Sequence, residues 1–410
     1  MTPPADTSPN RVRRRRVFHI PGYDPHPPRR YRELYRREGA AQAEIAGHAL
    51  AVEGLPGEAP FGWKVQARIE EQDCEARISV LDWRDLVRES MTGGPLFTYG
   101  RMLRVTWLYL STGTLRRLAG LRKGPILAAL YPVALLLLQL AIAVLAGWGA
   151  GRLLLALAGS GWAVTLAAWL LGFGLGYGLL VWFERQDARL YAYYLMNDYA
   201  FTASRRGAWP PALSARLSAF ATLIDEALSE NWDEVLVVGH SSGAQIAVSA
   251  LAEVLRGRGA STGPALSLLT LGQSIPVMSF LPDATRLRAD LAALSADDRL
   301  TWIDVSAPGD GCAFALCDPV AVTGVAPEAK RWPLVLSAAF SQRLSPERYA
   351  QLRRRYFRLH FQYLCAFDGP GPYDYFAITA GPITLSERFA GRRASASRIT
   401  EARSRYRATA

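Results

Sequence analysis

The chain has 410 residues, a net charge of +11 and four cysteines. This length accommodates one large domain of about 250 residues with additions, or two domains. The cysteines, at positions 74, 312, 317 and 365, have no metal-ligand spacing, which argues against a zinc site and a disulfide framework. No nucleic-acid reader motif accompanies the basic charge, so we expect no nucleic-acid partner.

The N-terminal segment 1–16 is rich in proline, polar residues and arginine, which predicts a disordered basic terminus. It lacks the apolar stretch of a signal peptide, so we expect this part of the chain to remain in the cytoplasm. The run Arg13–Arg16 is either attracted to anionic lipid or is a solvated tail. A buried strand ending in a Pro-Gly turn is predicted over Val17–Pro25, and a helix over Arg29–Leu50.

Residues 17–98 read as the first part of an α/β domain. Alternating apolar residues predict strands over Phe61–Gln72 and Glu75–Trp83, paired either as a hairpin around Gln72–Cys74 or in parallel. Segment 99–123 mixes Arg with Trp, Tyr and Leu, which predicts a helix in the membrane interface.

Segment 124–183 predicts a transmembrane hairpin. Gly124–Gly151 and Leu153–Phe183 contain no charged residue, and each exceeds the roughly 20 apolar residues that a span needs. Arg152 is expected in the connection between the two spans. Leu153–Ser160 belongs either to the second span or to this connection. Basic residues at both outer ends keep those ends in the cytoplasm by the positive-inside bias. The glycines at 172, 174, 176 and 178 form a small-residue stripe for close helix packing, or simply a flexible span.

Residues 184–385 predict the second part of the domain, and 386–410 a basic flexible tail. Helices are expected over 184–204, 211–230, 243–258 and 283–296, and buried strands over 235–238, 266–272 and 299–308. Strands that alternate with helices form a mostly parallel sheet with helices on both faces. The fold class is therefore α/β, with an inserted apolar helical pair.

The most informative stretch is Val235–Ala247. It places a G-x-S-x-G pattern, with Gly239, Ser241 and Gly243, between a strand and a helix. A sharp turn there strains the serine backbone and requires small neighbours, so it exposes the hydroxyl at the edge of the sheet. The alternative is a Gly-rich turn without chemistry.

A serine needs a base, and the base needs an acid that orients it. His360 is the one histidine of the sequence after Ser241. Asp310 follows the strand that ends at Pro308, and it is our first choice for the acid. Asp318 is the competitor, whereas Asp304 lies within the strand and is expected to be structural.

In these features the sequence resembles the α/β-hydrolase family, over roughly residues 17–90 and 190–385. The resemblance rests on the elbow and on the chain order Ser241, Asp310, His360. It implies an oxyanion hole made by the amide of Ser242 and by Gly22 or Tyr23, since Pro21 has no N–H. It also implies acyl transfer to water, with no metal and no cofactor.

We therefore expect a membrane-anchored serine hydrolase of lipase or esterase type that acts on a lipophilic ester, with membrane lipid as its other partner. A thioesterase or an acyltransferase would use the same triad. The alternative from another class is an inactive hydrolase-like membrane scaffold that binds a partner through the pocket.

Overall fold

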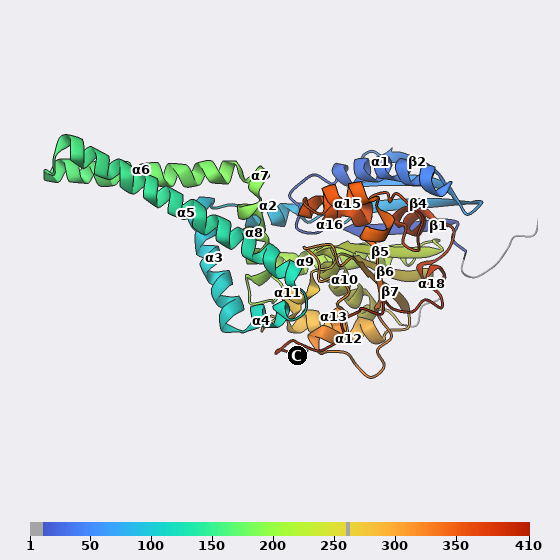
Figure 1. Cartoon of the computed structure of the whole chain (residues 1–410). Helices are drawn as coiled ribbons and strands as arrows, with labels where there is room; N and C mark the ends of the chain where they lie inside the picture. Colours follow the sequence, from blue (N-terminus) through green and yellow to red (C-terminus); the bar gives the residue numbers. More distant parts are fainter. Residues whose placement is uncertain (1–10, 260–262) are drawn as a thin grey trace, which may run out of the picture.

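The computed structural model describes residues 11–259 and 263–410. They form an α/β body from which two long helices project (Figure 1). The strands are β1 (Arg14–Ile20), β2 (Ala49–Leu55), β3 (Gly62–Ile69), β4 (Gln72–Val80), β5 (Glu234–His240), β6 (Ala265–Leu271), β7 (Leu300–Ser306) and β8 (Leu334–Ser337).

The helices divide between the body, the projecting pair and the layer that joins them. Before β5 they are α1 (Arg29–Ala46), α2 (Arg84–Ser90), α3 (Gly94–Ser111), α4 (Thr114–Ala119), α5 (Lys123–Ala158), α6 (Trp162–Arg185), α7 (Asp187–Leu190), α8 (Ala192–Ala203) and α9 (Pro211–Ala227). After β5 they are α10 (Gly243–Gly257), α11 (Ile275–Ser279), α12 (Thr285–Ala296), α13 (Pro319–Thr323), α14 (Phe340–Arg343), α15 (Pro346–Leu352), α16 (Tyr356–His360), the 3-10 turn η1 (Phe361–Leu364), α17 (Tyr375–Ala380) and α18 (Leu385–Arg388).

The sheet has the order β2-β3-β4-β1-β5-β6-β7-β8. β2, β3 and β4 pair antiparallel, and the remaining neighbours pair parallel. The central strand β5 is buried at every residue, as the apolar run of a two-sided parallel strand requires. The predicted mostly parallel sheet is confirmed, and of the two pairings left open for β3 and β4 the hairpin is found. Its turn lies at Glu70–Glu71, before the predicted position, and β2 and β8 were not predicted.

Helices cover both faces of the sheet. One face packs against α9, α10 and α12, through side chains such as Leu217, Leu251 and Leu291. The other packs against α1 and α17, through side chains such as Tyr35 and Phe376. Both faces are therefore sealed, as an α/β layer architecture requires.

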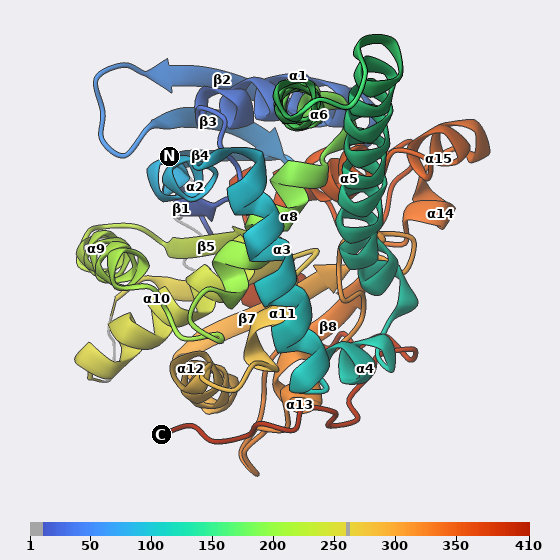
Figure 2. The same cartoon turned by 90° about the vertical axis from the view of Figure 1, so that its left-hand side faces the viewer.

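A third apolar cluster joins the body to the projecting helices. It combines α3, α4, α5, α6 and α8 with Phe280 of the α11 region and Phe314 of the loop after β7. Figure 2 shows α3 and α5 in front of the sheet. The predicted single helix over 99–123 is two helices, because the chain turns at Gly113 with a φ of 67°.

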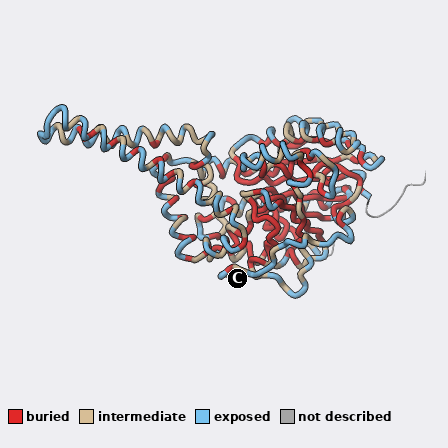
Figure 3. Tube along the Cα trace, in the orientation of Figure 1, coloured by how far each residue is buried: buried red, intermediate tan, exposed pale blue. Residues whose placement is uncertain are grey.

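The helices α5 and α6 are long and apolar enough to cross a membrane. Within their most apolar windows only 22% and 11% of the residues are buried, so they differ from core helices of a soluble domain (Figure 3). One expectation is wrong: Arg152 and Leu153–Ala158 belong to α5, and the connection to α6 is Gly159–Gly161.

The prediction that the four glycines of α6 allow close helix packing is correct for two of them. A Cβ added to Gly172 would lie 2.6 Å from the Gly147 oxygen, and one added to Gly176 would lie 3.1 Å from the Ala143 oxygen. Added Cβ atoms at Gly174 and Gly178 would meet nothing within 4 Å. The close contact therefore follows a four-residue helical spacing.

The basic N-terminal run is structural, which corrects both readings of Arg13–Arg16. Arg14, Arg15 and Arg16 lie in β1, and Arg15 is fully buried. Its Nε donates to Glu234 at 2.7 Å, and its other nitrogens donate to the carbonyls of Gly381 and Ile383. A buried guanidinium needs such partners, so this arginine joins the sheet to the C-terminal region. Residues 1–10 of the predicted disordered terminus lie outside the described residues.

The C-terminal segment 386–410 is docked on the body, which corrects the predicted flexible tail. Ile399 forms a bridge with Cys317, and Arg403 donates its amide to the Val322 carbonyl at 2.9 Å. Arg288 donates to the Ala408 carbonyl at 2.7 Å. The Arg- and Ser-rich composition of this segment gave no sign of these backbone contacts.

Candidate active site

Ser241 occupies a strained turn at the carboxyl end of the central strand. Its φ is 57°, in the left-handed region that an L-residue adopts at a cost, and its amide donates to the Leu271 carbonyl at 2.9 Å. The two glycines of the pattern are required by close packing. A Cβ added to Gly239 would lie 2.7 Å from the Ala244 Cα, and one added to Gly243 would collide with the carbonyls of Ile20 and Pro21.

The loop after β1 lies against this turn. A Cβ added to Gly22 would lie 2.9 Å from the Ser241 Cβ, so only glycine fits there. Tyr23 donates its amide to the Ser242 Oγ at 2.9 Å, which makes Tyr23 the least suitable of the three predicted oxyanion donors. Within the described residues, the backbone amides of Gly22 and Ser242 donate no hydrogen bond. Both remain available to a ligand.

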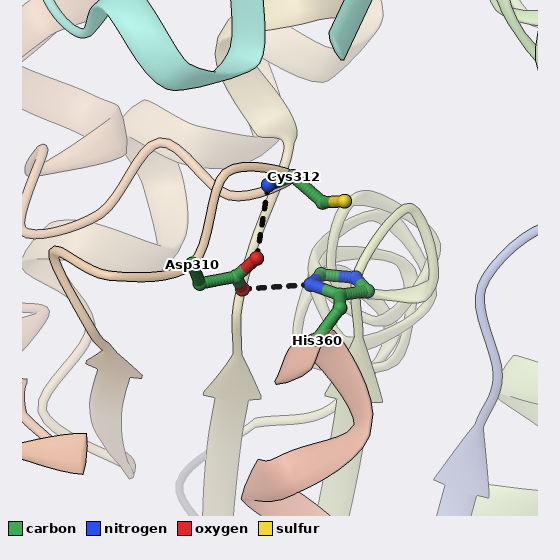
Figure 4. A group of neighbouring side chains, drawn as sticks. All are labelled: Asp310, Cys312 and His360. Carbon is green, nitrogen blue, oxygen red and sulfur yellow. Dashed lines mark hydrogen bonds and ion pairs between the residues drawn. The ribbon is translucent and has the colours of Figure 1, made fainter. Parts of the chain in front are cut away.

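Asp310 and His360 form a buried pair (Figure 4). The His360 Nδ1 lies 2.7 Å from the Asp310 Oδ2, and the two residues are only 5% and 2% exposed. A carboxylate accepts, so the contact places the ring proton on Nδ1 and leaves Nε2 as a base. The buried Nε2 has no hydrogen-bond partner among the described residues. The geometry thus provides an oriented imidazole with a free acceptor.

The Asp310 carboxylate accepts further hydrogen bonds. Its Oδ1 accepts the Cys312 amide at 2.9 Å, and its Oδ2 also accepts the Tyr363 hydroxyl at 3.0 Å. Tyr363 in turn accepts the Ala307 amide at 2.9 Å. Such a network fixes the direction of the carboxyl group. The sequence analysis missed Tyr363, although its position three residues after His360 on a helical turn was a usable signal.

His240 supports the backbone of His360. Its Nε2 lies 3.0 Å from the His360 carbonyl, and the two rings lie 4.7 Å apart between centroids. Burial lowers the pKa of His240 well below its ordinary value, so this ring stays neutral. His240 therefore acts as a positioning residue, a role that its place beside Ser241 did not reveal.

Ser241 and His360 line one cavity without a direct hydrogen bond between them in the described structure. The end of β6 brings Ser241 and His360 close to each other. The Leu271 carbonyl accepts the Ser241 amide, and the next residue, Gly272, packs on the His360 ring. A Cβ added to Gly272 would lie 3.2 Å from the His360 Cε1. Hydrogen bonds between a nucleophile and its base are often loose before substrate binds.

The competing carboxylates have other partners. Asp318 caps α13 by accepting the amides of Val320 and Ala321, and it pairs with Lys330 at 2.7 Å. Asp304 accepts the Thr270 hydroxyl at 2.6 Å inside the sheet. The structure thus brings Asp310, and neither alternative, to His360.

Cys312 adds a thiol to this group, as Figure 4 shows. Its sulfur lies within 4.8 Å of ligand atoms of Asp310 and His360, a set that could hold a metal ion. Burial and the nearby carboxylates raise the pKa of the Cys312 thiol well above its ordinary value, which disfavours the thiolate that binds metals. The Asp310–His360 hydrogen bond also occupies the Nδ1 ligand atom, so the group fits an acid–base pair better.

The cavity has a volume of about 1070 Å³ and extends from Ser241 to the base of the projecting helices. This volume is at the upper end of ligand pockets, which measure about 300–1,000 Å³. The α3, α5 and α8 helices contribute apolar lining, including Val105, Ile126 and Leu195. The site therefore opens into a space suited to an apolar ligand.

One carboxylate in the cavity was not predicted. Asp198 of α8 has no hydrogen-bond or ion-pair partner among the described residues, and burial raises its pKa to about 7. The neighbouring His360 opposes this shift. Asp198 is thus a titratable group that faces the ligand space.

The comparisons with known proteins found no matching family model, no similar curated protein and no similar solved structure.

Proposed function

We propose that the protein is a membrane-anchored serine hydrolase, related to the α/β-hydrolases, that cleaves an acyl ester. Ser241 is the nucleophile, His360 the general base and Asp310 the acid that orients it. The observation that carries the proposal is the left-handed Ser241 turn, which shares one cavity with the buried His360–Asp310 pair.

The proposed reaction has two halves. The Ser241 Oγ attacks the ester carbonyl carbon as His360 Nε2 accepts its proton, and the amides of Ser242 and Gly22 stabilise the oxyanion. The alcohol leaves with that proton, and an acyl-enzyme remains. Water then attacks the acyl group by the same route, which releases a carboxylic acid and restores the serine.

The test is covalent labelling with a fluorophosphonate probe. We expect the full-length protein in neutral detergent to be labelled, and Ser241→Ala to lose all labelling. The matched control is Ser242→Ala, which retains the elbow serine and the backbone amide. Absence of labelling in well-folded protein would instead favour the inactive scaffold.

The membrane anchor is part of the proposal. Exposed apolar side chains continue from α5 and α6 onto α3, where Leu103 and Trp107 are 67% and 72% exposed. This continuity supports α3 as the interfacial helix, and in the proposed arrangement the cavity lies beside lipid. Basic flanks favour a cytoplasmic body. Protease protection of a site engineered at Gly159–Gly161 in sealed vesicles tests this topology, because cleavage from the cytoplasmic side would contradict it.

A further inference from the structure

A basic segment lies between the base of the projecting helices and His360. Residues 353–355 connect α15 to α16, and the exposed residues Arg354, Arg355 and Arg358 of the connection and of α16 line the cavity. Phe357 of the same segment packs its ring 4.6 Å from the Tyr191 ring, next to α7. The segment therefore runs from α7 to the imidazole of the site.

These guanidinium groups are uncompensated. Within residues 11–259 and 263–410, the side chains of Arg354, Arg355 and Arg358 form no ion pair and no hydrogen bond, and the same is true of Arg189 on α7. Of the three carboxylates that line the cavity, Asp198 is unpaired among the described residues and the other two are occupied. Asp24 pairs with Arg30 at 3.1 Å, and Asp187 accepts the amides of Tyr193 and Tyr194. The segment thus presents positive charge without an internal partner.

An apolar part of the cavity begins at the first turns of α5. Residues 125–130 and Val133 line it from that helix, and Tyr109 and Leu118 line it from α3 and α4. A ligand that fills both parts needs an apolar chain at one end and an anion at the other. Guanidinium groups bind phosphate with charge-assisted, often bidentate hydrogen bonds, so a phosphate satisfies several of these arginines together.

We propose that the cavity binds a single-chain acyl ester whose alcohol portion carries a phosphate, with the acyl chain in the apolar part and the phosphate among Arg354, Arg355 and Arg358. This proposal rests on the proposed hydrolase function and names its substrate class. The arginines line the same cavity as His360 and Ser241, so binding the phosphate would hold the ester carbonyl near Ser241.

The test compares two esters in neutral detergent micelles, a monoacyl glycerol phosphate and a monoacylglycerol with the same chain. For the wild type we expect a higher kcat/KM with the phosphate ester. Joint replacement R354Q, R355Q and R358Q is expected to lower that preference at least tenfold, mainly through KM. The matched control, R392Q, R393Q and R398Q, removes the same charge from residues outside the cavity and should keep the preference.

Binding to Ser241→Ala separates this proposal from the hydrolase proposal. If neither ester is turned over, the hydrolase proposal fails. The anion site is still supported if the phosphate lipid binds and this binding is lost with R354Q, R355Q and R358Q. Inorganic phosphate should displace the lipid poorly, because it lacks the apolar chain. Equal affinity for both esters, equal loss in the control triple variant, or full displacement by phosphate would overturn the proposal.

Discussion

In the body, charged side chains are buried together with their partners, whereas the projecting α5–α6 hairpin exposes its apolar side chains and uses glycines for contact. Arg15 and Glu234 pair with no exposure at all, while Trp162 and Trp169 of α6 are 83% and 75% exposed. A domain folded in water buries a charged side chain only with its partner, whereas exposed apolar side chains would be stable in lipid. The two regions are thus built for different solvents.

The regions meet at the loops that carry the candidate site. A Cβ added to Gly124, at the base of α5, would lie 3.2 Å from the Gly311 Cα, one residue after Asp310. Arg122 donates to the Ala315 carbonyl at 2.7 Å, and on the other side the Tyr194 hydroxyl donates to the Tyr23 carbonyl. The start of α5 therefore contacts the loop of Asp310, and α8, which follows the hairpin, contacts the loop of Gly22 and Tyr23.

The largest expected effect lies in the body, where two aspartates near the end of β7 have different roles. Asp310→Asn should lower kcat roughly 10⁴-fold, because the amide no longer holds His360 in the productive tautomer. Asp318→Asn should keep kcat within a few-fold and lower stability by about 1–3 kcal/mol, since it loses the ion pair with Lys330.

The measurement is ester turnover beside thermal unfolding for both variants of the full-length protein. Loss of activity in Asp318→Asn with full activity in Asp310→Asn would reverse the assignment of the acid.

The second effect concerns the hairpin. In Gly172→Val the new side chain meets the Gly147 carbonyl, and overpacking of this kind costs about 1–3 kcal/mol. Gly174→Val is the control on the same helix, because a Cβ there meets nothing within 4 Å. Thermal unfolding in detergent should separate the two variants, while probe labelling of Ser241 stays intact below the transition. Equal destabilisation would show that α6 does not pack on α5 through this face.

The sequence predicted the parts of this comparison that depend on local pattern. The central strand, the Ser241 turn and the apolar helices each carry a periodicity or a run of one residue type, and the Asp310–His360 contact followed from chain order. Arg15 and the C-terminal segment were misread, because their partners lie far away in the sequence and composition alone resembles a solvated tail. Asp198 was missed because only the folded chain brings it to the site, whereas the spacing of Tyr363 three residues after His360 was a signal that was overlooked.

The smallest expected effect is a pH dependence at Asp198, where hairpin and body share the cavity. Because its pKa is raised to about 7, the carboxyl is mostly neutral below pH 7 and ionised above it. Tyr23, Tyr109, Tyr194, Tyr199 and Cys312 face it and stay neutral in this range, and the nearby His360 opposes the rise of the Asp198 pKa. An ionised group in apolar surroundings disfavours an acyl chain.

For a neutral acyl ester, kcat/KM should therefore fall roughly fivefold as the pH rises from 6 to 8.5. Asp198→Asn should remove this fall, whereas Asp73→Asn, at an exposed position of β4 outside the cavity, should keep it. A fall that survives in Asp198→Asn would mean that another group titrates there, and Asp198 would then be a polar contact of the α8 layer without influence on the ligand.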